Sequence, residues 1–464
     1  MHMADRCLQD CKKVHFIGVG GISMSGLACT LHSKGVAVSG SDAKHSDVLD
    51  DLEAIGIAVC VGHNAENVPG DVDLVVYTAA VKPDNPEMVQ AKAMGVRVID
   101  RAALIGLMMD GYDRPVCISG THGKTTTTSM IAQILLEAGT NPTLNIGGVL
   151  PSINSNYLVG GDDYFVVESC EYFDGFLNFK SHIGVVLNVE TDHLDYFKDL
   201  AHIEGSFGSF VGNISPGGAL VINETIPSFE RIARCARGRV VGYGAPGSRF
   251  RAEDVEYSRE GLASFGLLEN GEQVDRINLK LRGAHNVSNA LAAIAVCRVE
   301  GIPYKTIKAG LEAFTGSRRR YEYKGMMNGV SIFDDYAHHP TEIRATLAAA
   351  RNSEYGKLIC VFQPHTYTRT KKLLDELGAS FTDADTVVLL DIYSAREHDT
   401  GEIHSRDLEA RIRANGIEAH YMPSFDTAQS FLQQKCVHGD LLITMGAGDV
   451  HKLGEQMLST ELST

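Results

Sequence analysis

The stretch Val116-Cys-Ile-Ser-Gly-Thr-His-Gly-Lys-Thr-Thr-Thr-Thr128 decides how the rest of the chain is organised. Apolar residues of β type end at Ser119, a glycine-bearing loop leads to Lys124, and a helical pattern covers 129–138. This order of strand, loop and helix predicts a phosphate-binding loop, because free backbone N–H groups and the positive helix end face the anion. Lys124 would neutralise terminal phosphate charge, and the hydroxyl of Thr125 would hold Mg²⁺.

One position departs from the common form of this loop, G-x-x-x-x-G-K-[ST]. Ile118 stands where the first glycine is expected, and the first glycine of the stretch is Gly120, four residues before Lys124. A Gly-Lys-Thr sequence can arise at a strand-helix turn by chance. The correct order of strand, loop and helix favours phosphate binding over chance.

Length and composition indicate a soluble protein of two to four domains. The chain has 464 residues, of which 44% are hydrophobic and 22% charged, as in ordinary globular proteins. No apolar run reaches transmembrane length and the first residues lack the apolar core of a signal peptide, so we expect a cytoplasmic protein that does not bind membranes.

Cysteine usage argues against disulfide-bonded and zinc-binding proteins, and net charge argues against nucleic-acid-binding proteins. The ten cysteines are scattered without a C-x-x-C pair or zinc spacing, which is typical of reduced, mostly buried thiols. A formal charge of -16 argues against nucleic-acid binding, because phosphate neutralisation needs clustered Lys and Arg.

The first segment predicts a βα unit of Rossmann type. A strand beginning at Lys13 leads to Gly18-x-Gly20-Gly21 and a helix, and the next strand, 36–42, ends in Asp42. A dinucleotide site would show the same features, so a nicotinamide-dependent dehydrogenase stays open here. Against it, Ser23 stands where the dinucleotide fingerprint has its third glycine.

Two strands of the second segment carry polar residues at their carboxyl ends. Tyr164-Phe-Val-Val-Glu168 is one, and 183–189, which leads into His193, is the other. Ligands collect beyond the carboxyl ends of strands in an open α/β sheet, so Glu168 and His193 should face the same edge as Lys124. Taken singly, Glu168 can also be an acid that caps a strand, and His193 an ordinary loop histidine.

Downstream, 283–293 opens a helix with His285, Asn286 and Asn289 in its first turns, where such residues can also simply cap the helix. Three adjacent arginines, 318–320, follow at a domain joint, where they can be a solvated face or neighbours of a triphosphate.

The third segment repeats the alternation of strand and helix without a phosphate loop of its own. Its strands are expected within 329–342, 358–369, 386–394 and 441–450. We therefore predict an α/β protein of three domains: a Rossmann-like domain at 1–112, a central P-loop ATPase-type domain at 113–316 and a Rossmann-like C-terminal domain at 317–464.

The chain resembles the Mur ligases, ATP-dependent amide-forming enzymes of peptidoglycan precursor synthesis. The motifs that carry the resemblance lie in the family's order along nearly the whole chain: His15-Phe-Ile-Gly-Val-Gly-Gly-Ile-Ser-Met-Ser-Gly-Leu-Ala28, Gly120-Thr-His-Gly-Lys-Thr-Thr126, Asn188-Val-Glu-Thr-Asp-His-Leu-Asp195, His285-Asn286, Asp334-Asp-Tyr-Ala-His-His-Pro-Thr-Glu342, Phe362-Gln-Pro-His-Thr-Tyr-Thr-Arg-Thr370 and Gly446-Ala-Gly-Asp449.

The resemblance also implies the reaction and its participants. The substrate carboxylate takes the γ-phosphoryl group of ATP to form an acyl phosphate, and a free amine then displaces phosphate. Such a step depends mainly on positioning and charge neutralisation. The implied substrates are ATP, UDP-N-acetylmuramate and L-alanine, the cofactor is Mg²⁺ with Mn²⁺ expected to substitute, and the expected state is a monomer or weak homodimer.

Site residues follow from the same resemblance. Thr125 and Glu168 would hold one Mg²⁺, and Glu168 and His193 would hold a second. Lys124 would contact the terminal phosphates of ATP. His285 would lie near the reacting carboxylate. The ATP set is Gly120, Thr121, His122, Gly123, Lys124, Thr125, Thr126, Asn286, Asn289, Arg319 and Asp335. The UDP-sugar set is Gly18, Gly20, Gly21, Ser23, Met24, Ser25, Ser41, Asp42 and His63, and the amino-acid set is Tyr336, His338, Thr366 and Arg369.

Two positions depart from the family's commoner pattern. Many Mur ligases have a carbamylated lysine fifteen residues after the histidine that matches His193, and here that position is Gly208. The alanine-adding branch also lacks this lysine. The third-domain motif commonly has arginine where this chain has Thr366, which leaves Arg369 as the cation for an amino-acid carboxylate. The nearest rival is the related ligase that attaches a recovered tripeptide to the same UDP-sugar.

Overall fold

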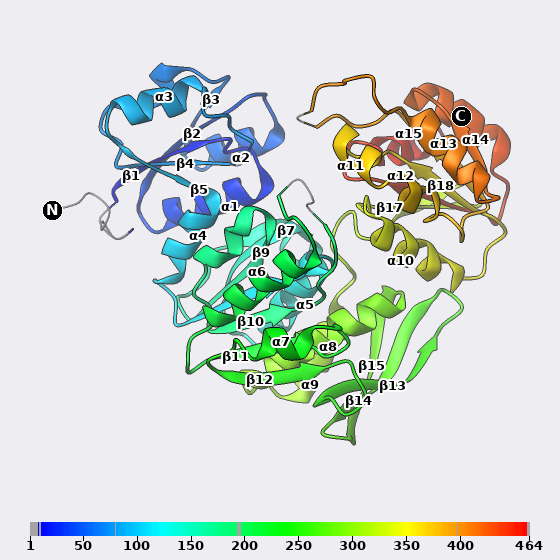
Figure 1. Ribbon diagram of the computed structural model, residues 1–464, viewed down its shortest axis with the longest axis horizontal. Helices are drawn as coiled ribbons and strands as arrows, with labels where there is room; N and C mark the ends of the chain where they lie inside the picture. The colour runs from blue at the N-terminus through cyan, green and yellow to red at the C-terminus, as the bar shows by residue number, and fades with distance from the viewer. Residues whose placement is uncertain (1–7, 9–10, 79, 193–195, 396, 462–464) are drawn as a thin grey trace. The chain divides into compact units, whose positions relative to one another are not determined.

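The structure is a computed structural model that describes residues 8, 11–78, 80–192, 196–395 and 397–461 (Figure 1). It contains three β-sheets with helices between their strands, which confirms the predicted α/β class. The chain divides into two compact units. The first unit comprises Met1–Ala252, Leu267–Asp275 and Asn289–Ala313, and the second comprises Glu253–Gly266, Arg276–Ser288 and Phe314–Thr464.

The N-terminal sheet of the first unit has five parallel strands in the order β3-β2-β1-β4-β5. The order reverses between β1 and β4, so the crevice for a ligand opens beyond the carboxyl ends of these strands. The strands are β1 (Lys13–Ile17), β2 (Ala37–Asp42), β3 (Ala58–Val61), β4 (Leu74–Tyr77) and β5 (Arg97–Asp100), and the helices are α1 (Ile22–Ser33), α2 (Asp47–Ala54), η3 (Ala65–Asn67), α3 (Pro86–Ala93) and α4 (Arg101–Met109).

The central sheet has ten strands in the order β15-β14-β13-β12-β11-β10-β6-β9-β7-β8. The strands are β6 (Arg114–Ser119), β7 (Thr143–Leu150), β8 (Ser155–Leu158), β9 (Tyr164–Ser169), β10 (Ile183–Val186), β11 (Ala219–Asn223), β12 (Arg239–Tyr243), β13 (Phe250–Tyr257), β14 (Leu262–Glu269) and β15 (Glu272–Arg282). The helices are α5 (Lys124–Glu137), η4 (Pro151–Ile153), η5 (Tyr172–Asn178), α6 (Leu200–Gly212), α7 (Phe229–Ala233), α8 (Ala284–Val299) and α9 (Tyr304–Ala313).

The strand that leads into the phosphate loop lies in the middle of this sheet. β6 pairs in parallel with β9 on one side and with β10 on the other. Val116, Cys117 and Ile118 of β6 are all buried, as expected for a parallel strand covered on both faces by helices. The carboxyl ends of β6, β9 and β10 therefore meet at one edge, as the sequence predicted for the residues that follow them.

The second unit contains a six-stranded sheet in the order β16-β17-β21-β18-β19-β20, parallel except for β16. The strands are β16 (Glu322–Met327), β17 (Val330–Asp335), β18 (Leu358–Phe362), β19 (Thr386–Leu389), β20 (Glu418–Tyr421) and β21 (Leu441–Met445). The helices are α10 (Pro340–Arg351), α11 (Tyr367–Lys372), α12 (Leu374–Gly378), α13 (Ser405–Ala414), α14 (Phe425–Lys435) and α15 (His451–Glu461).

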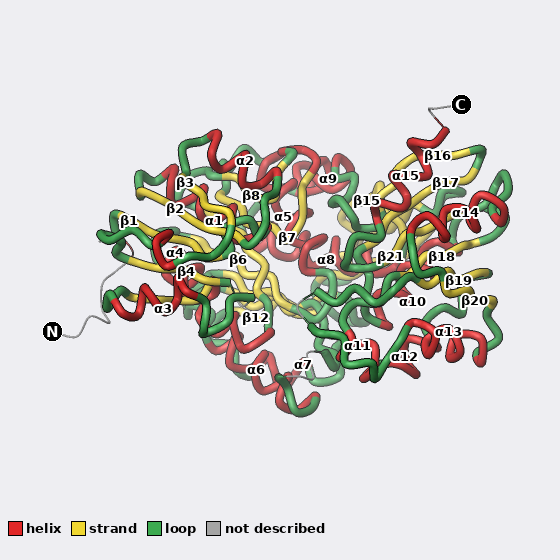
Figure 2. Tube along the Cα trace, turned by 90° about the horizontal axis from the view of Figure 1, so that it is seen from above, coloured by secondary structure: helices red, strands yellow, loops and turns green. Residues whose placement is uncertain are grey.

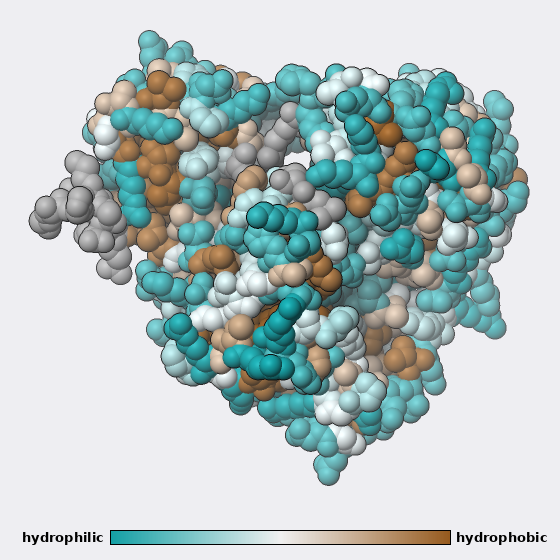
Figure 3. Space-filling model, in the orientation of Figure 1, coloured by the Kyte–Doolittle hydropathy of each residue, from teal (hydrophilic) through white to brown (hydrophobic). Residues whose placement is uncertain are grey.

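Helices flank the strands of each sheet (Figure 2), and the buried apolar side chains form cores between the two layers. Most of the face drawn in Figure 3 is hydrophilic, with hydrophobic residues scattered through it. None of the helices that the structure describes is both long enough and apolar enough to cross a bilayer.

Candidate functional site

The phosphate loop has the predicted form. β6 ends at Ser119, and α5 begins at Lys124, so the loop between them comprises four residues. Gly120 and Gly123 have φ angles of +143° and +82°. A Cβ atom on Gly120 would lie 2.9 Å from the Cβ atom of Leu187, and one on Gly123 would lie 2.6 Å from Oδ1 of Asn289. Both positions therefore require glycine.

Lys124 at the helix start is folded back over this loop. Its ammonium group donates to the carbonyl oxygen of Gly120 and, at 3.0 Å, to that of Thr121. It also lies 3.1 Å from Oε2 of Glu171. Burial lowers the pKa of Lys124, but the nearby carboxylates, Glu171 first, raise it by more, so the group stays charged. Sequence reasoning missed Glu171, although an acid three residues after Glu168 was visible at the end of a predicted strand.

Glu168 lies where the sequence placed it, at the end of β9, and it contacts two neighbouring elements. Its Oε2 accepts a hydrogen bond of 3.2 Å from the Thr125 hydroxyl, and its Oε1 accepts one of 2.5 Å from the backbone N–H of Gly147 in β7. A Cβ atom on Gly147 would lie only 2.6 Å from the Glu168 carboxylate. The close approach of this strand thus fixes the carboxylate beside the start of α5.

The donors at this point fit Mg²⁺. Hard oxygen ligands suit this ion, which usually takes one or two carboxylates together with substrate phosphates. Thr125 and Glu168 supply a hydroxyl and a carboxylate side by side. Among the residues that the structure describes, no group of three or more His, Cys, Asp or Glu side chains is arranged to hold a metal by itself. His193, the other predicted ligand, lies outside the described residues.

A side-chain clamp that the sequence analysis did not identify holds the middle of the loop. Oδ1 of Asn188 accepts a hydrogen bond of 2.7 Å from the N–H of His122, and its Nδ2 donates to the carbonyl oxygen of the same residue at 3.0 Å. Thr121 bonds in turn to the N–H of Glu190 through its hydroxyl, at 2.9 Å. The segment after β10 therefore supports the phosphate loop through both polar atoms of one amide.

The predicted helix with His285, Asn286 and Asn289 is confirmed as α8, and its residues have different surroundings. Asn286 is buried and donates to the carbonyl oxygen of Arg282 at 2.8 Å. His285 is exposed. Asn289 lies against Gly123 of the phosphate loop, where a Cβ atom would meet its amide oxygen. The contact of Asn289 with the phosphate loop supports a role for this residue beside the nucleotide.

The first Rossmann loop is tied to the strand beside it. The backbone N–H groups of Gly18 and Val19 donate to the carbonyl oxygen of Ser41, at 2.8 and 2.9 Å. The N–H of Gly20 donates to Oδ2 of Asp42 at 2.9 Å. Asp42 thus holds the loop itself, and the predicted residues at the ends of β1 and β2 do lie together.

Three of the other residues predicted for this site are in helix α1. Met24 is buried in the hydrophobic core, and the Ser25 hydroxyl donates to the carbonyl oxygen of Ile22 at 3.0 Å. Ser23 bonds to Asn145 of β7 through both its hydroxyl, at 3.0 Å, and its carbonyl oxygen, at 3.3 Å. Strand β7, whose Gly147 contacts Glu168, therefore also contacts the start of helix α1.

In the second unit, Arg319 and Asp335 lie at the carboxyl end of β17. Arg319 has a φ angle of +60° and donates to Oδ2 of Asp334 at 3.0 Å and to the carbonyl oxygen of Gly446 at 2.7 Å. Asp335 accepts from the N–H groups of Tyr321 and Ala337 at 2.8 and 2.7 Å. Burial raises the pKa of Asp335 to about 6, against a smaller opposing effect of the Arg320 charge.

The residues predicted to receive the amino acid also lie in this unit, and a series of contacts through His365 joins three of them. The rings of His338 and His365 are 5.6 Å apart, and Nη1 of Arg369 is 3.1 Å from Nδ1 of His365. Tyr336 also neighbours His338, with ring centroids 5.6 Å apart. The structure therefore brings these predicted side chains into one cluster after β17 and β18.

Thr366 has a structural position in the same cluster. It has a φ angle of +64° and is the N-cap of α11, where its hydroxyl accepts from the N–H of Arg369 at 3.4 Å. Asp375, an acid close to Arg369 in the sequence, pairs with Arg411 at 3.2 Å.

Three family models match consecutive parts of the chain. "Mur ligase family, catalytic domain" matches residues 13–113, "Mur ligase middle domain" matches 118–297 and "Mur ligase, glutamate ligase domain" matches 319–448. The chain belongs to the Mur ligase family. It has the three-domain α/β architecture of a Mur ligase.

Individual members of the Mur ligase family are similar over almost the whole length. The UDP-N-acetylmuramate–L-alanine ligase of Acetivibrio thermocellus is 50% identical over 449 residues, which are 96% of each chain. The crystal structure of the UDP-N-acetylmuramate-alanine ligase of Thermotoga maritima matches with a TM-score of 0.82 at 28% identity, over 97% of this chain and 99% of the other. A murein peptide ligase of Psychrobacter arcticus matches with a TM-score of 0.73 at 26% identity, over 97% and 98%.

Proposed function

We propose that this chain joins L-alanine to the carboxylate of UDP-N-acetylmuramate at the expense of ATP, the first amino-acid addition of peptidoglycan precursor synthesis. The observation that carries the proposal is the 50% identity, over 96% of both chains, with a Mur ligase named for this reaction. The phosphate loop with Lys124, Thr125 and Glu168 supplies the parts that an ATP-dependent step needs.

In this proposal the three domains divide the substrates among them. Residues 1–112 bind the UDP-sugar, 113–316 bind ATP and 317–464 bind the amino acid. The strand order of the first sheet supports the first assignment, because it reverses between β1 and β4, and ligands bind beyond the carboxyl ends of the strands at such a point. A location in the cytoplasm and a monomeric or weakly dimeric state stay predictions.

The phosphoryl transfer uses the residues around α5. Lys124 would exchange the carbonyl oxygens of Gly120 and Thr121 for terminal phosphate oxygens of ATP. Bound Mg²⁺ would neutralise negative charge between the phosphates and the substrate carboxylate, with Thr125 and Glu168 as its protein ligands. The Asn188 clamp holds His122 in place and so fixes the path of the phosphate loop. The acyl phosphate forms when the sugar carboxylate attacks the γ-phosphorus atom and ADP leaves with the electrons of the broken P–O bond.

The second half of the reaction is the attack of an amine on the acyl phosphate. The guanidinium group of Arg369 is suited to hold the carboxylate of L-alanine, because it offers several fixed N–H donors. Arg369 contacts His365, and the ring of His365 neighbours that of His338, which supports this assignment. His285 would lie near the reacting carboxylate, and Arg319 and Asp335 would close over ATP.

The rival within the family is ligation of a recovered tripeptide to the same UDP-sugar. A murein peptide ligase is structurally similar to this chain, but with a lower TM-score and lower identity than the alanine ligase structure. Incubation with ATP, Mg²⁺ and UDP-N-acetylmuramate, with either L-alanine or the tripeptide, separates the two by product mass. We expect the alanyl product at a much higher kcat/KM, and preferential conversion of the tripeptide would overturn the proposal.

A further inference from the structure

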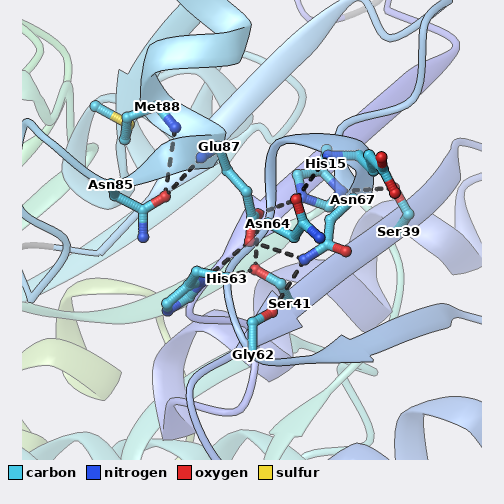
Figure 4. Close-up of polar contacts among 11 residues, drawn as sticks. His15, Ser39, Ser41, Gly62, His63, Asn64, Asn67, Asn85, Glu87 and Met88 are labelled. Atoms are coloured by element: carbon cyan, nitrogen blue, oxygen red, sulfur yellow. Dashed lines mark hydrogen bonds and ion pairs between the residues drawn. The ribbon is translucent and has the colours of Figure 1, made fainter.

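A further carboxylate lies buried under the proposed UDP-sugar site. Glu87, in the first turn of α3, has a fully buried side chain, and four side chains from other elements converge on it (Figure 4). Its Oε2 bonds to His15 Nε2 at 2.9 Å and Ser41 Oγ at 2.8 Å. Its Oε1 bonds to His63 Nδ1 and Asn67 Nδ2, each at 3.0 Å.

The group is ionised in this position. Burial raises the pKa of Glu87, but the hydrogen bonds from His15, Ser41, Asn67 and His63 together lower it to about 2. A buried carboxylate costs free energy unless it is fully hydrogen-bonded, and here each oxygen has two donors. The location at a helix N-terminus adds a favourable dipole.

The contacts decide which nitrogen of His63 carries a proton. The single proton of the Ser41 hydroxyl is donated to Glu87, so the Ser41 oxygen, 3.2 Å from His63 Nδ1, is an acceptor there. Nδ1 of His63 therefore faces two acceptors and must carry its proton. An unprotonated Nδ1 would place a lone pair 3.0 Å from the carboxylate of Glu87.

The position of His63 connects this network to the substrate side of the sheet. His63 follows Gly62 at the carboxyl end of β3, and Figure 4 shows it on the opposite side of the Glu87 carboxylate from His15. Its side chain is 23% exposed, whereas that of His15 is 1% exposed. With Nδ1 tied to Glu87, Nε2 is the ring nitrogen that remains for a ligand.

We propose that Glu87 is a positioning residue for nucleotide binding: it fixes the Nδ1 proton and ring orientation of His63, so that Nε2 faces the uridine diphosphate part of the substrate. This inference rests on the proposed function for the substrate itself. Glu87 does not touch the substrate and acts through His63.

The tautomer can be measured directly on the unmodified protein with ¹⁵N-labelled histidine and long-range ¹H–¹⁵N correlation NMR. We expect His63 to carry a proton on Nδ1 in the free protein, and its Nε2 resonance to move on saturation with UDP-N-acetylmuramate. An unprotonated Nδ1, or an Nε2 resonance that does not move on saturation, would overturn the inference. Failure of the wild-type protein to bind the sugar nucleotide would instead refute the proposed function.

A mutant cycle separates positioning from general stability. Glu87→Gln should raise the Kd for UDP-N-acetylmuramate about two- to tenfold, the range expected for one hydrogen bond, and should add no further loss in a His63→Ala background. Ser39→Ala is the matched control, because Ser39 bonds to His15 at 2.9 Å and Figure 4 shows it on the opposite side of the network from His63. It should lower the melting temperature and leave the Kd unchanged. Additive losses from Glu87→Gln and His63→Ala, or an equal rise in Kd for Ser39→Ala, would assign Glu87 a purely structural role.

Discussion

Replacement of Gly147 by alanine should move the Glu168 carboxylate without removing any of its atoms. The new Cβ atom would lie 2.6 Å from Oε2, so the oxygen would have to retreat by about 0.8 Å to reach an ordinary contact of 3.4 Å. Glu168 is tied to Gly147 N–H at 2.5 Å and to Thr125 at 3.2 Å, and a shift of this size breaks or lengthens both hydrogen bonds.

A displacement near 1 Å in a catalytic group can cost a hundredfold in rate. We therefore expect Gly147→Ala to lower kcat by one to two orders of magnitude, roughly ten- to a hundredfold, and to raise the Mg²⁺ concentration needed for half-maximal activity. The assay is phosphate release at saturating substrates, titrated with Mg²⁺. Gly147 is exposed on its strand, so the melting temperature should change little.

Gly205→Ala in α6 is the matched control, because its added Cβ atom meets nothing within 4 Å. This variant should be neutral or slightly more stable, with unchanged kinetics. If Gly147→Ala keeps the wild-type kcat and the wild-type Mg²⁺ dependence, Glu168 is not a metal ligand.

Four further predictions concern Lys124, Arg369, Asn188 and Glu87. Lys124→Ala should abolish turnover and leave the calorimetric Kd for UDP-N-acetylmuramate unchanged; a weakened Kd would contradict the assignment of this residue to ATP. Arg369→Ala should raise the KM for L-alanine roughly ten- to a hundredfold, with little change in the KM for ATP. An unchanged KM for L-alanine would show that other groups hold the carboxylate of the amino acid. Thr366→Ala, which removes an N-cap, should mainly lower the melting temperature. Asn188→Ala should raise the KM for ATP, because two hydrogen bonds to the phosphate loop are lost, and wild-type ATP kinetics would refute the clamp. Because the pKa of Glu87 falls from 4.5 to about 2 on folding, its carboxylate stabilises the protein above pH 4.5 and loses this contribution, on the order of 3 kcal/mol, as the pH falls towards 2. The difference in unfolding free energy between the wild type and Glu87→Gln should shrink over that range, and a constant difference would show that Glu87 is not ionised.

The sequence predicted those parts of the site that are local along the chain. The phosphate loop could be identified because strand, glycines, Lys124 and helix follow one another within about fifteen residues. Glu168 could be assigned to the same edge because carboxyl ends of parallel strands converge. The displaced glycine at 120 proved compatible with the loop, since its φ angle and close neighbours still require a residue without a side chain.

The contacts that hold the site in place were not predictable in the same way. Asn188 and His122 are 66 residues apart, and Gly147 lies 21 residues from the carboxylate it constrains, so only the pairing of strands brings each pair together. Glu87 follows Asn85-Pro86, and this sequence predicts an ordinary acid in the first turn of a helix. Its burial depends on hydrogen bonds to four side chains from three other segments of the chain. Periodicity and spacing carry no signal for such contacts.

The proposed ligase reaction requires three substrates together, and one measurement tests this most directly. Phosphate release is followed with ATP and Mg²⁺ alone, then with UDP-N-acetylmuramate, then with each amino acid in turn. We predict release only when the sugar nucleotide and an amino acid are both present, with the highest kcat/KM for L-alanine. An equal rate of ATP hydrolysis with and without UDP-N-acetylmuramate would contradict the assignment.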